Sequence, residues 1–272
     1  MGPIPPSAHV LVQLQRLLAD LNTGLDDIAR LILLDAALTT RIIRLSNSAW
    51  FGRGLPCTSI EEAVNRIGFR EVYHFVAVAV SSALVAQPVP AYGRDSLEMW
   101  TDSVTGAFAA EALAQRVGED AANAYLIGLL HVIGRLPVNR YLMGQGSLTR
   151  ALADDGYPHE FSGAEFALLG FHQAEVGAQL LAAWEFQPSV TQPVRHQYDP
   201  LSAEEPHDRM AVLLYAARLI RIAASGVEID PEGGDATEAD ILGSLALTRA
   251  DVLALVPGVR ETFSRARLMM KV

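Results

Sequence analysis

Histidines and carboxylates in the second half of the chain have spacings that could serve metal chemistry. His131 lies near the end of the apolar stretch 121–136, where a ring nitrogen could bind a metal or form a hydrogen bond with the chain. His172 and Glu175 are three residues apart, so on a helix they share one face and could provide two ligands. Both patterns also occur in purely structural positions, because buried polar side chains usually find hydrogen-bond partners. A metal site and a set of structural histidines are therefore both open.

Helical periodicity runs through the chain and must position these residues. Apolar side chains recur every three to four residues, and no sustained alternation typical of strands occurs. Thr23 with Asp26 and Ser59 with Glu62 match the capping box that begins a helix. The sequence therefore predicts an all-α protein.

The stretch 121–136 is expected to form one helix that ends at Gly134 and Pro137. Gly128 interrupts its interior at a cost of about 1 kcal/mol against alanine, which predicts that another backbone or a bulky side chain packs closely there. His131 would then lie in the last turn of the helix.

The helices are expected to form two lobes. Five helical segments with short connections precede a turn-rich stretch, residues 88–95, whose sequence is PVPAYGRD. This stretch predicts a two-lobed helical bundle with an N-terminal five-helix lobe, 1–92, and a C-terminal helical lobe, 93–272.

Composition limits the classes of function. Half of the residues are hydrophobic and 19% are charged, as expected for a packed globular protein. The net charge of −10 disfavours nucleic-acid binding, which needs clustered Lys and Arg. The single cysteine, Cys57, fits a reducing compartment, and no signal peptide is visible at the start, so we expect a cytoplasmic protein. The uncharged run 75–86 is shorter than the ~20 residues of a membrane span and is expected to be a core helix.

Several segments carry a family resemblance. Residues 31–52, LILLDAALTTRIIRLSNSAWFG, and residues 58–72, TSIEEAVNRIGFREV, resemble the N-terminal half of the HDOD family, an HD-related output domain of bacterial signalling proteins. Residues 128–136, GLLHVIGRL, resemble the family's G-L-L-H-D-I-G segment, and residues 171–184, FHQAEVGAQLLAAW, resemble its D-H-A-E-V-G-A segment. The resemblance covers most of the chain and implies an HD-like C-terminal lobe.

The resemblance also implies where a di-metal pocket would lie in an active HD relative. Asp102 takes the place of a histidine, and Val132 and Ala217 take the places of two metal-binding aspartates. Aspartate can bind a metal, but near a helix start Asp102 is better explained as a solvated carboxylate. The resemblance therefore implies a vestigial HD pocket without metal or other cofactor, whose positions are Asp102, His131, Val132, His172, His196 and Ala217.

Function follows from the loss of these ligands together with the family's role. Two metals need several histidines and carboxylates at one pocket, and three changed positions do not meet that need. We therefore expect a catalytically silent regulatory protein, not an enzyme, that acts in signal transduction through contacts with an unidentified protein partner. Neither nucleic acid nor membrane is expected as a partner, and a homodimer is left open. The alternative is a metal-dependent phosphohydrolase or phosphodiesterase of the HD superfamily.

One loop is a candidate contact surface. Residues 47–56, NSAWFGRGLP, place Trp50 and Phe51 beside two glycines, with Arg53 close by. Each ring can bury about 150 to 250 Å², so both can wedge the N-terminal lobe against its neighbour. Interfaces also favour tryptophan with arginine nearby, so one ring could instead stay exposed as a partner anchor.

Overall fold

The computed structural model describes residues 5–20, 22–52, 54–144, 152 and 162–269. Helices and turns make up this part of the chain, which contains no strand and a single isolated bridge between Val89 and Arg94. The prediction of an all-α protein is confirmed.

The chain divides into two compact units. The first comprises Met1–Ala83 together with Phe263–Val272, and the second comprises Leu84–Thr262. The second unit therefore begins before the boundary expected at residue 93, and the end of the chain is grouped with the first unit.

The first unit is built on a buried apolar core. Its helices are α1 (Pro6–Ala19), α2 (Leu25–Leu33), α3 (Ala36–Ser46), α4 (Ile60–Ile67) and most of α5 (Phe69–Val85). Ile32, Ile42 and Val64, from α2, α3 and α4, are fully buried. The run 75–86 lies mostly in α5, where Val76 is fully buried, so the prediction of a core helix is confirmed.

Helix starts follow the sequence signals in one case and depart from them in another. Ser59 is the N-cap of α4 and accepts a hydrogen bond from the backbone N–H of Glu62, as expected. Helix α2 does not begin at Thr23 with Asp26. Its N-cap is Gly24, whose N–H donates to Asp27 at 2.9 Å, because Thr23 instead donates its hydroxyl to the end of α1.

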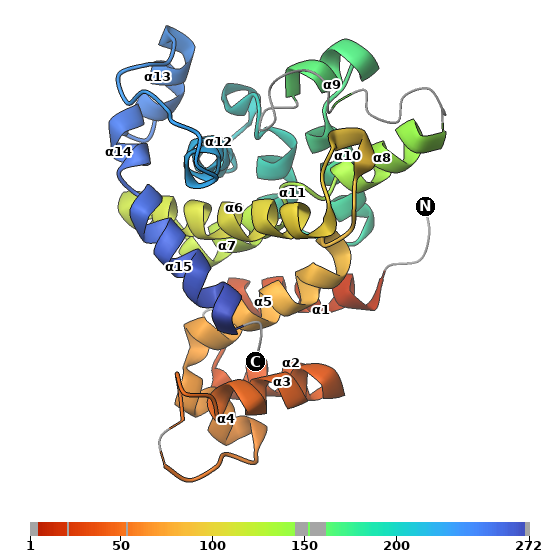
Figure 1. Cartoon of the computed structure of the whole chain (residues 1–272), viewed down its shortest axis with the longest axis vertical. Coiled ribbons are helices and arrows are strands. Elements are labelled where there is room, and N and C mark those ends of the chain that lie inside the picture. Colours follow the sequence, from red (N-terminus) through yellow and green to blue (C-terminus); the bar gives the residue numbers. More distant parts are fainter. Residues whose placement is uncertain (1–4, 21, 53, 145–151, 153–161, 270–272) are drawn as a thin grey trace. The chain divides into compact units, whose positions relative to one another are not determined.

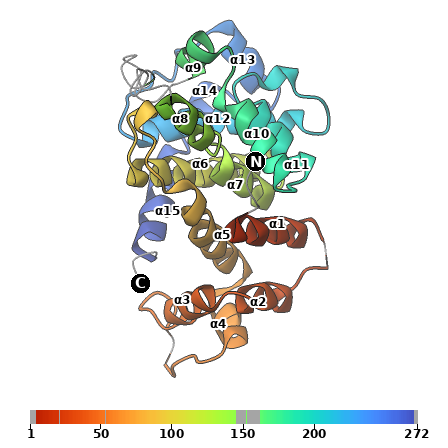
Figure 2. The same cartoon turned by 90° about the vertical axis from the view of Figure 1, so that its right-hand side faces the viewer.

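The second unit contains the remaining helices. They are η1 (Pro90–Tyr92), α6 (Ser96–Val117), α7 (Ala121–Leu130), α8 (Arg135–Gly144), α9 (Ser162–Leu169), α10 (Gln173–Ala183), α11 (Pro188–Arg195), η2 (Pro200–Ser202), α12 (Asp208–Ala224), α13 (Ala236–Gly243), α14 (Arg249–Leu253) and the first half of α15 (Val256–Met269), whose second half belongs to the first unit. Helix α6 packs against α7 and α12 (Figure 1), and α10 and α11 pack against each other beside α7 (Figure 2). The helical prediction over 147–169 is tested only from residue 162 on, because 147–151 and 153–161 lie outside the described residues.

The helix expected over 121–136 is two helices. Helix α7 ends at Leu130, a turn follows, and α8 begins at Arg135. Pro137 lies in the first turn of α8, where the missing N–H has no helical partner to lose, so it does not end a helix as expected. By length and composition the stretch Ala121–Gly144 could cross a membrane, but 72% of its apolar window is buried inside the protein.

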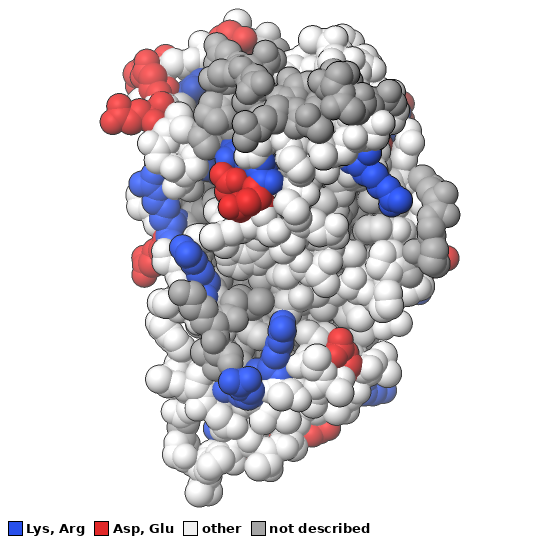
Figure 3. Space-filling model, turned by 45° about the vertical axis from the view of Figure 1, so that its right-hand side comes forward, with Lys and Arg blue, Asp and Glu red and all other residues white. Residues whose placement is uncertain are grey.

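Charged side chains are dispersed over the described residues on one face of the protein. On the face shown in Figure 3, the blue side chains stand singly or in small groups between uncharged residues, and the described residues there form no continuous basic band.

Candidate functional site

The site begins with a close approach of α6 and α7. A Cβ atom at Gly128 would lie 2.5 Å from the carbonyl oxygen of Gly106 and 2.6 Å from the Cα of Ala107, so the predicted backbone contact at Gly128 is confirmed. Gly106 in turn makes room for an imidazole, because a Cβ there would lie 2.5 Å from Cε1 of His131. The glycines at 106 and 128 thus allow the two helices to pack closely and leave room for the His131 ring.

Asp102, on α6, is shared by two arginines. Arg135 Nη1 donates to Oδ2 at 2.8 Å, and Arg221 Nη1 donates to Oδ1 at 3.0 Å. The side chains of Arg135, Arg221 and Asp102 are 2%, 5% and 13% exposed. Burial alone raises the pKa of Asp102, but Arg221 and Arg135 outweigh it and hold this pKa well below its usual range. The expectation of a solvated carboxylate is therefore wrong, and Asp102 is the centre of a buried ion-pair cluster.

His131 is buried at the C-terminal end of α7. Its Nδ1 lies 2.6 Å from the carbonyl oxygen of Gly128, and because a carbonyl only accepts, Nδ1 carries the proton and donates it. The carbonyl oxygen of His131 accepts from Nε2 of Gln173 and of Gln197 at 3.0 and 3.1 Å. Burial, and then the two arginines bound to Asp102, lower the pKa of His131 to about 3, so the ring is neutral at pH 7.

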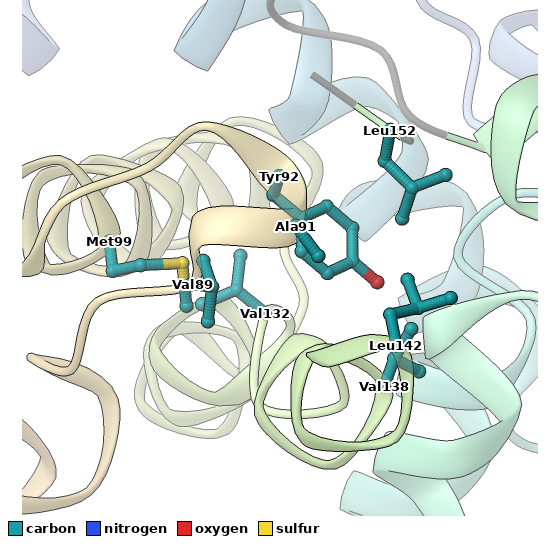
Figure 4. Packing of buried hydrophobic residues seen from close by; sticks show 8 residues of the cluster. All are labelled: Val89, Ala91, Tyr92, Met99, Val132, Val138, Leu142 and Leu152. Carbon is teal, nitrogen blue, oxygen red and sulfur yellow. The ribbon is translucent and has the colours of Figure 1, made fainter. Parts of the chain in front are cut away.

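Val132 is a core residue. It is fully buried in an apolar cluster of the second unit, beside Val89 and Met99 (Figure 4). The other members of the cluster are Ala91, Tyr92, Val138, Leu142 and Leu152. The position that would carry an aspartate in an active HD relative is therefore filled by a side chain that packs with hydrocarbon.

Ala217 lies on α12 and lines a small pocket together with His131 and the arginines Arg135, Arg218 and Arg221. The pocket has an empty volume of about 320 Å³ when the solvent at its mouth is counted. Only about one water molecule fits into it. Asp102 is bonded to two of these arginines. The structure therefore brings together three of the six expected positions, namely Asp102, His131 and Ala217.

His172 and Glu175 do not form a ligand pair on a helix face. His172 is the N-cap of α10, and its backbone N–H donates to Glu175 Oε1 at 3.2 Å, so Glu175 caps the helix. The His172 ring packs between Phe166 and Tyr198, with ring centroids 5.4 Å away in both cases. Glu165 is fully buried, with Oε2 4.0 Å from His172 Nδ1, which has no hydrogen bond within the described part of the chain.

His196 is the C-cap of α11 and also lies apart from the pocket lining. Its Nδ1 is 2.9 Å from Ser202 Oγ, which places it in a local hydrogen bond near the surface. Its neighbours Gln197 and Tyr198 line the pocket instead. His131 and His196 are thus hydrogen-bonded through their rings, whereas His172 is hydrogen-bonded through its backbone N–H and its Nδ1 has no partner within the described part of the chain.

The donors near the pocket do not fit a di-metal centre. Val132 and Ala217 carry no ligand atoms, and both oxygens of Asp102 are bonded to cationic groups that repel a metal ion. His131 can offer one ring nitrogen, Nε2. Within the described residues, no three His, Cys, Asp or Glu side chains are grouped so that they could hold a metal.

Sequence reasoning missed the two arginines, although the spacing carried a signal. Arg135 follows His131 by four residues, and Arg221 follows Ala217 by four. Ala217 and Arg221 share a face of α12, so that spacing was informative, whereas a turn separates His131 from α8 and the spacing to Arg135 was not. Gln173, whose backbone N–H donates to the buried Glu165 at 2.8 Å, carried no comparable signal.

The loop that carries Trp50 is fastened at both ends. The side-chain amide of Asn47 bonds both backbone groups of Cys57, at 2.7 and 2.8 Å, and Arg66 donates to the carbonyl oxygen of Leu55 at 3.1 Å. Trp50 nevertheless keeps 51% of its surface exposed, and Phe51 is partly buried. Arg53 lies outside the described residues.

Comparison with known proteins supports the family resemblance. The sequence pattern of the HDOD domain matches residues 4–200, so α12 with Ala217 lies beyond the matched region. An uncharacterised protein of Treponema pallidum is 29% identical over 222 residues, which are 80% of this chain and 42% of that protein.

Solved structures of similar fold extend the likeness to the whole chain. A protein from Marinobacter aquaeolei VT8 described as a signal transduction protein has a TM-score of 0.75 and 25% identity, covering 100% of this chain and 60% of that chain. An HDOD domain protein of unknown function from Geobacter sulfurreducens has a TM-score of 0.71 and 19% identity, covering 98% and 93%. A protein from Shewanella amazonensis described as a phosphohydrolase has a TM-score of 0.67 and 23% identity, covering 100% and 94%.

The chain thus spans less than two thirds of both the Treponema and the Marinobacter relatives. The match over residues 4–200 and the all-helical fold shared with these structures lead to one conclusion: this chain belongs to the HDOD domain family.

Proposed function

We propose that this chain is a regulatory domain of signal transduction that is catalytically silent and acts through contacts with a separate protein. One observation carries the proposal: both carboxylate oxygens of Asp102 are bonded to the guanidinium groups of Arg135 and Arg221. Two fixed positive charges thereby occupy the carboxylate at the pocket where an HD hydrolase would hold metal ions. In this proposal the pocket stabilises the fold of the second unit, and signalling occurs through contacts at the protein surface.

The loop around Trp50 is our candidate for that surface. Rigid, half-exposed aromatic rings make good anchors because they bury a large area with little loss of side-chain entropy. The hydrogen bonds of Asn47 and Arg66 fix the chain at Cys57 and Leu55, while Trp50 stays 51% exposed. We include Phe51 and Arg53 in the candidate contact region because they are its neighbours in the chain.

Partner capture with a loop variant tests the surface. Trp50→Ala removes a half-exposed ring, so it should lower stability by only about 1 to 2 kcal/mol, below the ~3 to 5 kcal/mol of a buried tryptophan. The variant should lose partners that the wild-type chain captures from its host, as identified by mass spectrometry. Leu201→Ala is a suitable control, since Leu201 is 57% exposed in the other unit.

The outcomes separate several explanations. Capture that is unchanged in Trp50→Ala would remove the loop from the proposal, and a collapse of the melting temperature would show that the ring is structural. Recovery of this chain itself as the captured protein would identify a homodimer. We further propose a cytoplasmic location, consistent with the buried free thiol of Cys57.

A metal-dependent phosphohydrolase is the second candidate, favoured by the description of the Shewanella relative. A hydrolysis assay with nucleotides and cyclic dinucleotides, run with added manganese or iron, tests it. We expect no turnover above the level of a Gly106→Leu variant, in which a larger side chain fills the place of the His131 ring. Metal-dependent turnover by the wild-type chain that this variant lacks would contradict catalytic silence.

A further inference from the structure

Helix α3 presents a positively charged side to solvent. In the first unit it packs against α2 and α4 (Figure 2), and Leu38, Ile42 and Leu45 are buried at the helical repeat. Arg41 and Arg44 are three residues apart on the solvent-exposed side of the helix. No Asp or Glu occurs within α3, so the helix itself offers these two charges no partner.

The side chains of Arg41 and Arg44 take part in no ion pair or hydrogen bond within the described residues. The neighbouring helices differ in this respect. On α2, Arg30 pairs with the carboxylate of Asp27. On α4, Arg66 pairs with Glu62. In a chain of net charge −10, two exposed positive charges without a counter-ion form a surface that is complementary to a negatively charged partner.

Apolar side chains are exposed at both ends of α3. Leu33 and Leu34 directly precede its N-cap, Asp35, and are 51% and 75% exposed. Trp50 follows the C-cap, Asn47, by three residues and is 51% exposed. The 11 residues of α3 have a length of about 16 Å, so a partner helix of similar length reaches from one apolar end to the other.

We propose that this side of α3 binds an acidic amphipathic helix of the partner protein. Carboxylates of that helix pair with Arg41 and Arg44, and its apolar side chains cover Leu34 and Trp50. Two arginines are too few for nucleic acid, whose binding neutralises several phosphates at once. The inference rests on the proposed function, because it names the kind of partner that the surface around Trp50 takes.

Two synthetic helical peptides test the charge preference of the site. Both carry leucines on one face, and the opposite face carries glutamates in one peptide and lysines in the other. Fluorescence anisotropy of each labelled peptide is measured during titration with the full chain. We expect saturable binding of one glutamate peptide per chain, and binding at least about tenfold weaker for the lysine peptide, since ion pairs are replaced by like-charge contacts.

Charge reversal tests the two arginines. The double variant Arg41→Glu, Arg44→Glu should bind the lysine peptide more tightly than the glutamate peptide. The double variant Arg140→Glu, Arg195→Glu is the matched control, because it changes the net charge equally at two exposed arginines on α8 and α11 of the second unit. This control should keep the preference of the wild-type chain, and the melting temperatures of both variants show that they are folded.

Three outcomes would overturn the acidic partner: equal binding of the two peptides, no saturation by the glutamate peptide, or the same preference in both double variants. Binding of the wild-type chain to phosphatidylglycerol vesicles that Arg41→Glu, Arg44→Glu abolishes would assign this side of α3 to a membrane surface and also overturn it. If Trp50→Ala abolishes partner capture but the wild-type chain shows no peptide preference, the proposed function stands and only this inference is rejected.

Discussion

Replacing Asp102 by asparagine should strongly destabilise the second unit. The change removes the negative charge that lies between Arg135 and Arg221, which are 2% and 5% exposed, and so takes from two buried guanidinium groups the carboxylate that both of them bond. Removing one partner of a buried ion pair typically costs about 3 to 5 kcal/mol. Asparagine keeps one oxygen that can accept from one arginine, so we expect the lower end, about 3 kcal/mol.

The magnitude can be measured as a shift in melting temperature. For a unit of this size about 1 kcal/mol corresponds to a shift of about 2 to 4 °C, so Asp102→Asn should lower the midpoint of the second unit by about 6 to 12 °C. Glu119→Gln makes the same chemical change in the surface pair with Arg209, where the two side chains are 26% and 45% exposed. Its cost should stay within about 1 kcal/mol.

The structure also predicts how the difference in stability between the wild-type chain and Asp102→Asn depends on pH. Because the pKa of Asp102 is lowered in the folded chain, its stabilisation is fully present above the ordinary carboxyl value of 3.8 and is lost only as pH falls toward the lower folded pKa. The gap between wild type and Asp102→Asn, measured by scanning calorimetry, should therefore be constant from pH 5 to 8. A gap no larger than that of Glu119→Gln would refute the claim that the ion-pair cluster is buried and stabilising.

Three further changes probe the same region. The pKa of His131 is lowered to about 3 in the folded chain, so on acidification the imidazole of the unfolded chain is protonated first. The free energy of unfolding should therefore fall by about 1.4 kcal/mol per pH unit below pH 6.5. His131→Asn should remove this pH dependence, as measured by thermal melts in acid. Gly134→Ala should lower the free energy of unfolding in urea by more than about 3 kcal/mol, because its Cβ would lie 1.9 Å from the carbonyl oxygen of Gln173. Gly163→Ala is the control: a Cβ there has nothing within 4 Å, so the change should be neutral or slightly stabilising. Val132→Asp should lower the melting temperature without any gain of bound metal, since it buries a carboxylate in the apolar cluster, and a stable variant that retains metal through dialysis would contradict this.

Local features of the fold were readable from the sequence because their hydrogen bonds are local. The N-caps Ser59 and Thr248 bond a backbone N–H three residues ahead, and Gly68 ends α4 with a positive φ of 93°. The close contact at Gly128 was readable too, because a glycine inside an apolar helix has few other uses. Its partners on α6 could not be named from the pattern.

The centre of the site was less readable because it depends on partners far apart in the chain. Asp102 meets Arg135 and Arg221 across 33 and 119 residues, and no local pattern encodes such pairs. Glu175 could be either a ligand or a cap at the same spacing from His172, and only the position of the helix start decides between them. Absent ligands at Val132 and Ala217 could be recognised from the sequence, and of the two arginines only Arg221, four residues after Ala217 on one helix, left a local signal.

The metal content of the purified chain tests the central claim most directly. Elemental analysis of protein prepared from cells grown with iron and manganese, without chelators, counts ions bound per chain. We expect no stoichiometric transition metal, because Asp102 is bonded to two arginines and Val132 and Ala217 offer no ligand atoms. Two tightly held iron or manganese ions per chain would contradict the account.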